Sequence, residues 1–201
     1  MKFGHLGIAG ILALGSSFSH AATPVFFDDF NSYAMDQINW SPPASSGWIV
    51  SGGTVDLIGV GGAFDLVPGN GGYVDLDGST GQAGQFSANV SLLGGVMYTL
   101  SFDLAGSHRG SSETVNVTFG SMAQSFSLAS ADPFSSHSLS FSHVTAGSYS
   151  FGYQNLGGDN IGILLDNVAV TAVPEPETYA MVFAGLGLVG WMAGRRKQSA
   201  G

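Results

Sequence analysis

The chain has 201 residues, a length that suits one domain with processed ends. It contains no cysteine, which excludes disulfide bonds, thiolate zinc sites and cysteine nucleophiles. Only five residues are lysine or arginine and fourteen are acidic, so the net charge of −9 argues against a surface that binds nucleic acid phosphates. The hydrophobic content of 44% argues against disorder.

The first 22 residues show the order of features found in a secretory signal peptide. Lys2 supplies the charged start, residues 6–14 form a short apolar run, and a Ser-His-Ala sequence ending at Ala21 supplies the small residues of a cleavage site. We therefore predict a signal peptide within residues 1–22, which signal peptidase cuts after Ala21 or, as the second choice, after Ala22. The remaining chain is expected to be exported.

Residues 23–172 show the alternation of apolar and polar residues that is typical of β-strands. On residues 86–92, for example, the apolar side chains lie on one face, and similar short runs recur between Gly, Ser and Asn residues. The expected strands cover residues 25–30, 48–50, 54–58, 73–76, 86–92, 98–104, 115–119, 124–128, 139–141, 149–153 and 161–170. About ten or eleven short strands in roughly 150 residues predict an all-β domain, an antiparallel jelly-roll β-sandwich. An immunoglobulin-like sandwich stays open as the alternative, although its Cys–Trp–Cys pattern is absent.

A series of short segments in this domain carries a resemblance. Residues 48–50 are followed by 53–58, by 72–78 and by 98–106, and the segment 165–168 (Leu-Asp-Asn-Val) comes near the end. The series resembles the choice-of-anchor C domains of bacterial surface proteins and is similar to galactose-binding-like jelly rolls of plant cell-wall proteins. It implies a galactose-binding-like jelly roll.

The same resemblance implies a structural Ca²⁺ ion that ties the N-terminal segment to the last strand. The residues at the matching positions are Asp28 or Asp29 and Asp166. Carboxylate oxygens are the ligands that Ca²⁺ prefers, and the domain has few competing cations. The alternative is that these acids are solvated or cap turns.

Aromatic residues beside loops favour a carbohydrate as the ligand of the domain. Sugars present apolar C–H faces and hydroxyl groups, so their sites combine an aromatic platform with a few polar groups. Trp40 precedes a Ser-Pro-Pro segment and is expected to be exposed, Tyr73 lies beside a loop, and His108 with Arg109 marks a polar, cationic loop. Trp48 is expected in the core instead, because apolar residues follow it. These features predict binding of a carbohydrate or extracellular polysaccharide by Trp40, Tyr73, His108 and Arg109.

Two loops, at residues 41–47 and 59–72, are rich in Pro, Gly and Ser and are candidates for the lining of a binding surface. No catalytic motif accompanies them. The G-x-S-x-G motif, which forms the nucleophile turn of many serine hydrolases, is absent. The sequence also gives no pair of acidic residues that we can place at the separation in space that a glycosidase requires. We predict that the protein is not an enzyme, with a secreted polysaccharide hydrolase and a purely structural biofilm matrix protein as the alternatives.

Residues 173–201 form a tail of a different composition. Pro174, Glu175 and Pro176 interrupt regular structure, because the prolines lack a backbone donor. Residues 179–194 are uncharged and mostly apolar. As a helix they would rise about 24 Å, somewhat short of a bilayer core of roughly 30 Å. We predict a marginal transmembrane helix over residues 179–194.

The tail closes with three cations, Arg195, Arg196 and Lys197. The positive-inside rule places them in the cytoplasm and the bulk of the protein outside. A Pro-Glu-Pro segment, an apolar helix and a terminal basic cluster in this order resemble the PEP-CTERM sorting signal of exported proteins of Gram-negative bacteria. The resemblance implies that an exosortase, a membrane protease, recognises and removes the tail, and that the protein reaches the cell surface or extracellular matrix.

Overall fold

The computed structural model describes residues 23–33, 36–142, 145–173 and 182–191. Strands make up nearly all the regular structure of these residues, with one 3-10 turn (η1, Ala44–Ser46) and one helix at residues 182–191. The strands are β1 (Pro24–Asp28), β2 (Trp48–Ser51), β3 (Asp56–Ile58), β4 (Tyr73–Asp75), β5 (Gln85–Leu92), β6 (Met97–Ala105), β7 (Glu113–Phe119), β8 (Met122–Leu128), β9 (Ser135–Phe141), β10 (Gly147–Asn155) and β11 (Leu164–Val173). The prediction of an all-β domain is confirmed.

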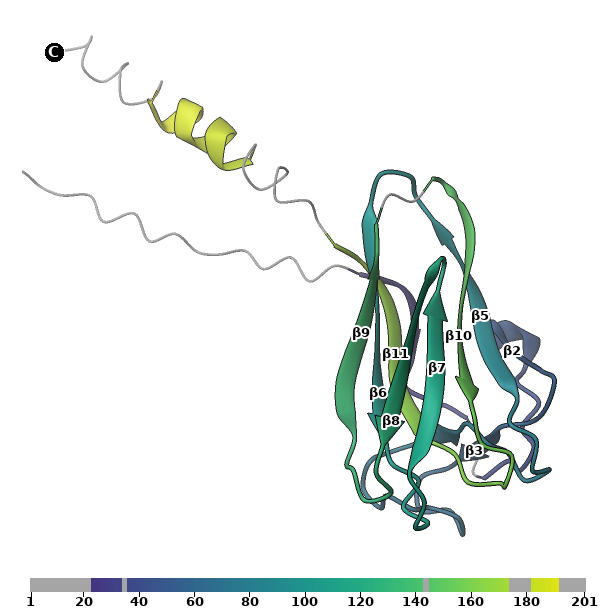
Figure 1. Ribbon diagram of the computed structural model, residues 1–201. Helices are drawn as coiled ribbons and strands as arrows, with labels where there is room; N and C mark the ends of the chain where they lie inside the picture. The colour runs from purple at the N-terminus through teal and green to yellow at the C-terminus, as the bar shows by residue number, and fades with distance from the viewer. Residues whose placement is uncertain (1–22, 34–35, 143–144, 174–181, 192–201) are drawn as a thin grey trace, which may run out of the picture.

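The strands form two antiparallel sheets that pack face to face (Figure 1). One sheet has the order β3-β4-β11-β6-β9, with β1 also paired to β11, and the other has the order β2-β5-β10-β7-β8. The last strand, β11, lies between β4 and β6 and also pairs with the first strand, β1. The two ends of the domain therefore meet in one sheet. Such interleaving of distant strands is typical of jelly-roll sandwiches.

The core lies between the two sheets and follows the alternation seen in the sequence. On β5 the side chains of Phe86, Ala88, Val90 and Leu92 are buried, while the residues between them are partly or fully exposed. The indole of Trp48 stacks on the ring of Phe86, with 4.0 Å between centroids. The prediction that Trp48 lies in the core is confirmed.

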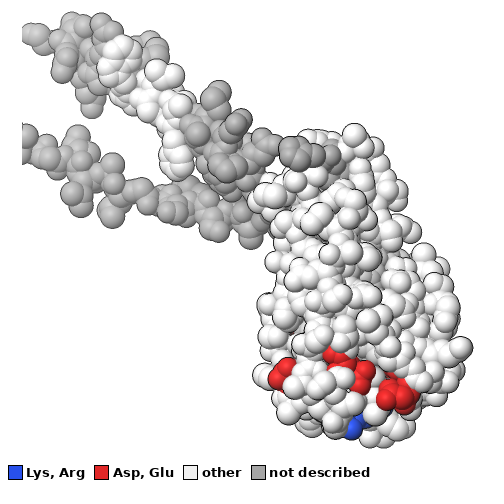
Figure 2. Space-filling model, viewed as in Figure 1, with Lys and Arg blue, Asp and Glu red and all other residues white. Residues whose placement is uncertain are grey.

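The sandwich has two unlike ends, which we call the terminal pole and the loop pole. At the terminal pole β1 begins and β11 ends, and the connections at residues 93–96 and 120–121 are short. The long connection at residues 59–72 lies at the loop pole, where β1, β6, β8 and β10 end. Figure 2 shows acidic and basic atoms gathered at the loop pole, with the rest of the visible described surface uncharged.

The charge gathers at the loop pole because aspartates hold the long loops there. Backbone N–H groups in loops lack the partners that a sheet provides, and aspartate side chains accept their hydrogen bonds. Asp36 accepts hydrogen bonds from the N–H groups of Gly59 and Phe64, at 2.9 and 3.2 Å. Asp56 accepts them from Asn39 and Ser79.

The predicted ends of the chain fall largely outside the described residues. The signal peptide (1–22), the Pro-Glu-Pro segment (174–176) and the basic cluster (195–197) all lie outside them. Of the predicted transmembrane helix, residues 182–191 are described and are helical and exposed. Within the described part of the chain, no helix has both the length and the apolar character needed to span a bilayer.

Candidate functional site

Trp40 is not the exposed aromatic residue that the sequence led us to expect. Its side chain is 3% exposed, and its ring packs against Tyr33 and Phe86, at centroid distances of 4.9 and 6.0 Å. The backbone N–H of Trp40 donates to the carbonyl of Val55 at 2.7 Å. The chain around Trp40 therefore pairs with the segment leading into β3, and this pairing turns the indole inward to cover the core.

Tyr73 is also buried and cannot serve as a platform for a sugar. Its hydroxyl accepts hydrogen bonds from the backbone N–H groups of Leu66 and Val67, at 2.6 and 3.2 Å. The same hydroxyl donates to Asp65 Oδ1 at 3.2 Å. Tyr73 thus fixes the shape of the loop at residues 59–72 from below, which is a positioning role.

A pocket of about 370 Å³ opens at the loop pole, beside this loop. Its volume falls within the range of roughly 300–1,000 Å³ that is usual for small-molecule sites. The lining combines apolar and polar side chains: Ile38, Ile58, Ala63, Phe64 and Leu66, with Asp56, Asp65, Asp75, Ser79, Arg109 and Asn160. A mixture of this kind suits a ligand that has both apolar and hydrogen-bonding faces.

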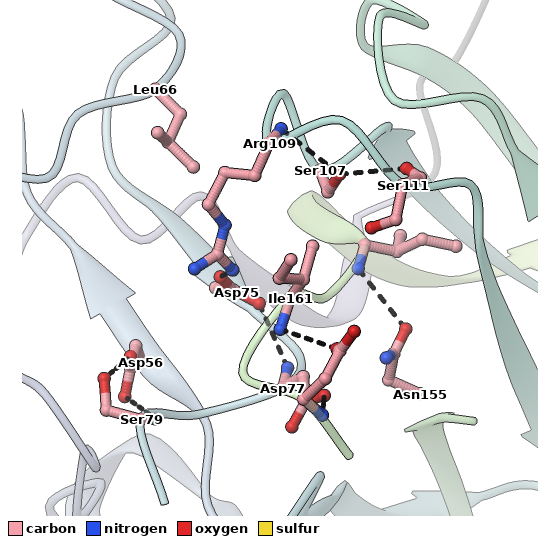
Figure 3. A network of polar contacts seen from close by, with 12 residues as sticks. Asp56, Leu66, Asp75, Asp77, Ser79, Ser107, Arg109, Ser111, Asn155 and Ile161 are labelled. Carbon is pink, nitrogen blue, oxygen red and sulfur yellow. Dashed lines mark hydrogen bonds and ion pairs between the residues drawn. The ribbon is translucent and has the colours of Figure 1, made fainter. Parts of the chain in front are cut away.

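An ion pair between Asp75 and Arg109 forms the polar centre of the pocket (Figure 3). Asp75 ends β4 and is 3% exposed, whereas Arg109 reaches it from the loop between β6 and β7. Arg109 Nη2 donates to Asp75 Oδ2, and the backbone N–H of Asp77 donates to Asp75 Oδ1 at 3.0 Å. The Arg109 side chain stays 28% exposed, so part of the guanidinium group is accessible from outside.

The surroundings of Asp75 change its affinity for protons. Burial raises the pKa of Asp75 to about 7, an effect that the nearby charge of Arg109 opposes and those of Asp56 and Asp77 increase. At neutral pH this carboxyl group is therefore divided between its protonated and ionised forms. It can donate or accept a hydrogen bond, as a ligand hydroxyl also can.

Asp56 lies opposite Asp75 in the pairing of β3 with β4, but its oxygens are engaged within the protein. Asp56 Oδ1 accepts hydrogen bonds from the N–H groups of Asn39 and Ser79, at 2.6 and 3.2 Å. Asp56 Oδ2 accepts one from the Ser79 hydroxyl at 2.6 Å. Asp56 therefore stabilises the pocket wall, and Arg109 is the group with the most unused donors, since a guanidinium has five N–H groups.

Phe64 is the exposed aromatic residue of the pocket, and the sequence did not lead us to expect it there. Its side chain is 54% exposed, and its backbone N–H is held by Asp36. The feature of the sequence that could have indicated this role is a single large aromatic residue within the glycine-rich loop at residues 59–72. The loop at residues 59–72, which the sequence marked as a candidate lining, does line the pocket.

His108 and Arg109 are neighbours in the chain but differ in placement. His108 is exposed and does not line the pocket; its backbone has a φ of 52°, in the left-handed region. The Arg109 N–H donates to Ser107 Oγ at 3.3 Å, and the Gly110 N–H donates to Ser130 Oγ at 2.7 Å. These contacts fix the loop that aims Arg109. Of the four predicted ligand-binding residues, Arg109 alone is part of the pocket lining.

Asp28 does not fit the predicted calcium site. Asp28 Oδ2 accepts hydrogen bonds from the Tyr33 hydroxyl and from Trp48 Nε1, at 2.6 and 2.8 Å. Asp28 Oδ1 accepts one from the N–H of Phe30 at 2.9 Å. This carboxylate faces donors that belong to the core, so it stabilises the fold instead of facing a cation.

Asp29 and Asp166 are close enough to influence each other. The pKa of Asp166 is raised to about 6, chiefly by burial and in smaller part by the charges of Asp103 and Asp29. Asp166 Oδ2 accepts a hydrogen bond from Asn70 Nδ2 at 2.9 Å. Across the described residues, no three acidic, histidine or cysteine side chains gather closely enough to hold a metal ion. Calcium binding is not tested by this arrangement and stays a prediction, with Asp29 and Asp166 as its remaining residues.

Comparison with known proteins bears on both parts of the chain. Residues 172–197 match the PEP-CTERM protein-sorting motif, which confirms that resemblance and implies export, with anchoring by the C-terminus before processing. No curated protein sequence matches the chain significantly.

The fold is similar to that of solved carbohydrate-binding modules. The CBM22-1 xylan-binding domain from Paenibacillus barcinonensis Xyn10C superposes with a TM-score of 0.51 at 13% identity, over 77% of this chain and 97% of that domain. The CBM22-1-CBM22-2 tandem domain of the same protein gives a TM-score of 0.52 at 13% identity, over 80% of this chain and 49% of the tandem. At this identity the similarity concerns the fold. The chain thus combines a jelly-roll sandwich, whose fold is similar to that of carbohydrate-binding modules, with a PEP-CTERM sorting motif at the C-terminal side of the sandwich.

Proposed function

We propose that this protein is sorted to the cell surface by its PEP-CTERM tail, which an exosortase removes, and that its sandwich binds a carbohydrate without catalysis. The observation that carries the binding proposal is the pocket at the loop pole. It places an exposed aromatic ring, Phe64, beside a partly exposed ion pair, Asp75–Arg109. The fold of carbohydrate-binding modules supports this proposal.

The pocket offers the two kinds of contact that a sugar requires. The ring of Phe64 can pack against the C–H face of a pyranose, and apolar walls such as Ile38 and Leu66 extend that surface. The free N–H groups of Arg109 can donate to hydroxyl oxygens, and Asp75 can accept from a hydroxyl group. Extracellular polysaccharide is the ligand class that fits an exported protein of this kind.

The arrangement of acids favours binding over hydrolysis. A glycosidase needs one carboxyl that protonates the leaving group and one that is free to act as base or nucleophile. Both oxygens of Asp56 and both oxygens of Asp65 already accept hydrogen bonds from the protein. Neither carboxyl is therefore free to act as the base or nucleophile that would have to work beside Asp75.

Titration of soluble neutral polysaccharides, beginning with xylan, against the protein tests this function. Phe64→Ala should weaken binding about tenfold, as expected for the loss of roughly 1.4 kcal/mol of stacking. Arg109→Met should weaken it at least as much. Phe27→Ala is the matched control, because Phe27 is 59% exposed but lies on β1, outside the pocket lining.

Two results would contradict the proposed function. If Phe64→Ala and Phe27→Ala bind as tightly as the wild type, the pocket is not the site. If new reducing ends appear during incubation with the polysaccharide, the secreted hydrolase becomes the better account.

A structural calcium ion is a separate proposal, supported by the proximity of Asp29 and Asp166. Removing calcium with a chelator should lower the melting temperature, and Asp166→Asn should make the protein insensitive to the chelator. A melting temperature of the wild type that the chelator does not change would contradict the proposal of a structural calcium ion.

A further inference from the structure

The separation of charge along the sandwich is complete within the described residues. All twelve acids of the domain and Arg109 lie in loops of the loop pole or within three residues of the strand ends that meet there. The described residues of the terminal pole carry no acidic or basic side chain. The domain is therefore strongly anionic at one end and uncharged at the other.

The terminal pole also exposes large apolar side chains. Leu93 is 69% exposed in the turn between β5 and β6, and Met97, at the start of β6, is 39% exposed. Met97 lies opposite Val173 in the pairing of β6 with β11. Met122, which follows the turn between β7 and β8, is 46% exposed.

The sorting tail leaves the domain at this same pole. The match to the sorting motif begins at residue 172, within β11, and the described helix begins at residue 182. Residues 174–181 lie between Val173 and that helix. Eight residues can span at most about 29 Å when fully extended. An anchored tail therefore keeps the terminal pole close to the bilayer.

We propose that the terminal pole lies on the lipid surface while the tail anchors the protein, so that the pocket at the loop pole faces away from the membrane. Leucine and methionine side chains gain from entering the interface between headgroups and acyl chains, and this pole has no charge to desolvate. Anionic lipids repel the acidic loop pole. Apolar contact and electrostatic repulsion thus favour the same orientation.

This inference rests on the tail acting as an anchor and does not depend on which glycan the pocket binds. Its physical consequence is an ordered presentation of the binding site before processing. Removal of the tail would then release a domain whose contact with lipid is weak, because a few exposed apolar side chains provide a small surface.

The absence of cysteine permits a clean fluorescence test on the full chain. Leu93→Cys and Leu156→Cys place one thiol at each pole, since Leu156 is 57% exposed directly after β10 at the loop pole. Each variant is labelled with an environment-sensitive fluorophore and reconstituted into vesicles of phosphatidylcholine and phosphatidylglycerol. Lipids with a nitroxide near the headgroup should quench the probe at position 93 several-fold more than the probe at position 156.

A charge placed on the terminal pole separates surface contact from simple tethering. In the Leu93→Cys protein, Met122→Asp should reduce the quenching by nitroxide lipids, whereas Leu156→Asp at the other pole should leave it unchanged. If Met122→Asp has no effect, the tether alone holds the pole near the bilayer and the proposal is wrong.

The remaining outcomes also decide between accounts. A chain that does not float with the vesicles contradicts anchoring, and the proposed orientation with it. A chain that floats while the probe at position 93 stays unquenched contradicts the orientation alone. If position 93 becomes shielded in a dimer without vesicles, the pole binds a second copy of the chain instead of lipid.

Discussion

The buried carboxyl of Asp75 makes the stability of this fold depend on pH in a defined direction. Burial raises its pKa from 3.8 to about 7 in the folded protein. Between these values the folded protein retains a proton that the unfolded chain releases, so the free energy of unfolding falls as the pH rises. Below the lower value both states are protonated, and above the higher value both are ionised, so the dependence ends there.

The size of the effect follows from the difference between the two pKa values. Well inside this window each pH unit changes the free energy of unfolding by about 1.4 kcal/mol. Because the folded carboxyl is already about half ionised at pH 7, a change from pH 5 to pH 7 lowers the free energy of unfolding by about 2 kcal/mol. That is a large part of the roughly 5–15 kcal/mol that stabilises a typical domain. Asp166, whose pKa burial raises to about 6, adds to the loss in the same direction.

Urea denaturation between pH 5 and pH 8 measures this dependence, with tryptophan fluorescence as the signal. The wild type should lose stability steadily up to about pH 7, and Asp75→Asn should lose much less over the same range. Asp166→Asn serves as the comparison for the smaller contribution. Stability that rises with pH, or a slope in Asp75→Asn equal to that of the wild type, would refute the assignment of the effect to Asp75.

Four substitutions test the packing around the core and the site. Trp48→Phe removes the hydrogen bond to Asp28 and part of the ring stack, and should cost about 2–4 kcal/mol in urea denaturation. Gly106→Ala places a Cβ 2.0 Å from a backbone carbonyl oxygen and should cost about 2–4 kcal/mol, whereas Gly158→Ala meets its nearest atom at 3.5 Å and should cost less than about 1 kcal/mol. Tyr73→Phe should lower stability by about 1–2 kcal/mol, and limited proteolysis should then cut the loop at residues 59–72 sooner; equal cleavage rates would contradict the positioning role.

The sequence predicts the sandwich well because alternation reports directly on burial in a two-layer fold. The run at residues 86–92 becomes β5 with its apolar side chains inward, and the expected strand at 73–76 becomes β4 with a change of one residue at its end. The order of strands within each sheet is not contained in this local signal. It depends on contacts such as that of β11 with both β4 and β6, which join residues far apart in the chain.

The site was harder to predict because exposure of a loop residue depends on how the loop folds back. Trp40 precedes a Ser-Pro-Pro segment, yet its backbone pairs with the chain before β3 and its ring enters the core. Phe64 lies in an equally loop-like segment but stays exposed, because Asp36 holds the backbone of that loop. Arg109 could be identified from the sequence as the domain's lone lysine or arginine, but its partner Asp75 could not, since 34 residues separate them.

The most direct test of glycan binding at the loop pole is a nuclear magnetic resonance titration of the side-chain N–H groups. Arg109 is the one arginine of the domain, so its Nε–H signal reports on the pocket. Trp40 and Trp48 are both buried, so their indole signals report on the core. Addition of a binding polysaccharide should shift the Nε–H resonance of Arg109 and leave the indole resonances of Trp40 and Trp48 in place. Saturating binding that leaves the Arg109 resonance unchanged would contradict the assignment of the pocket as the binding site.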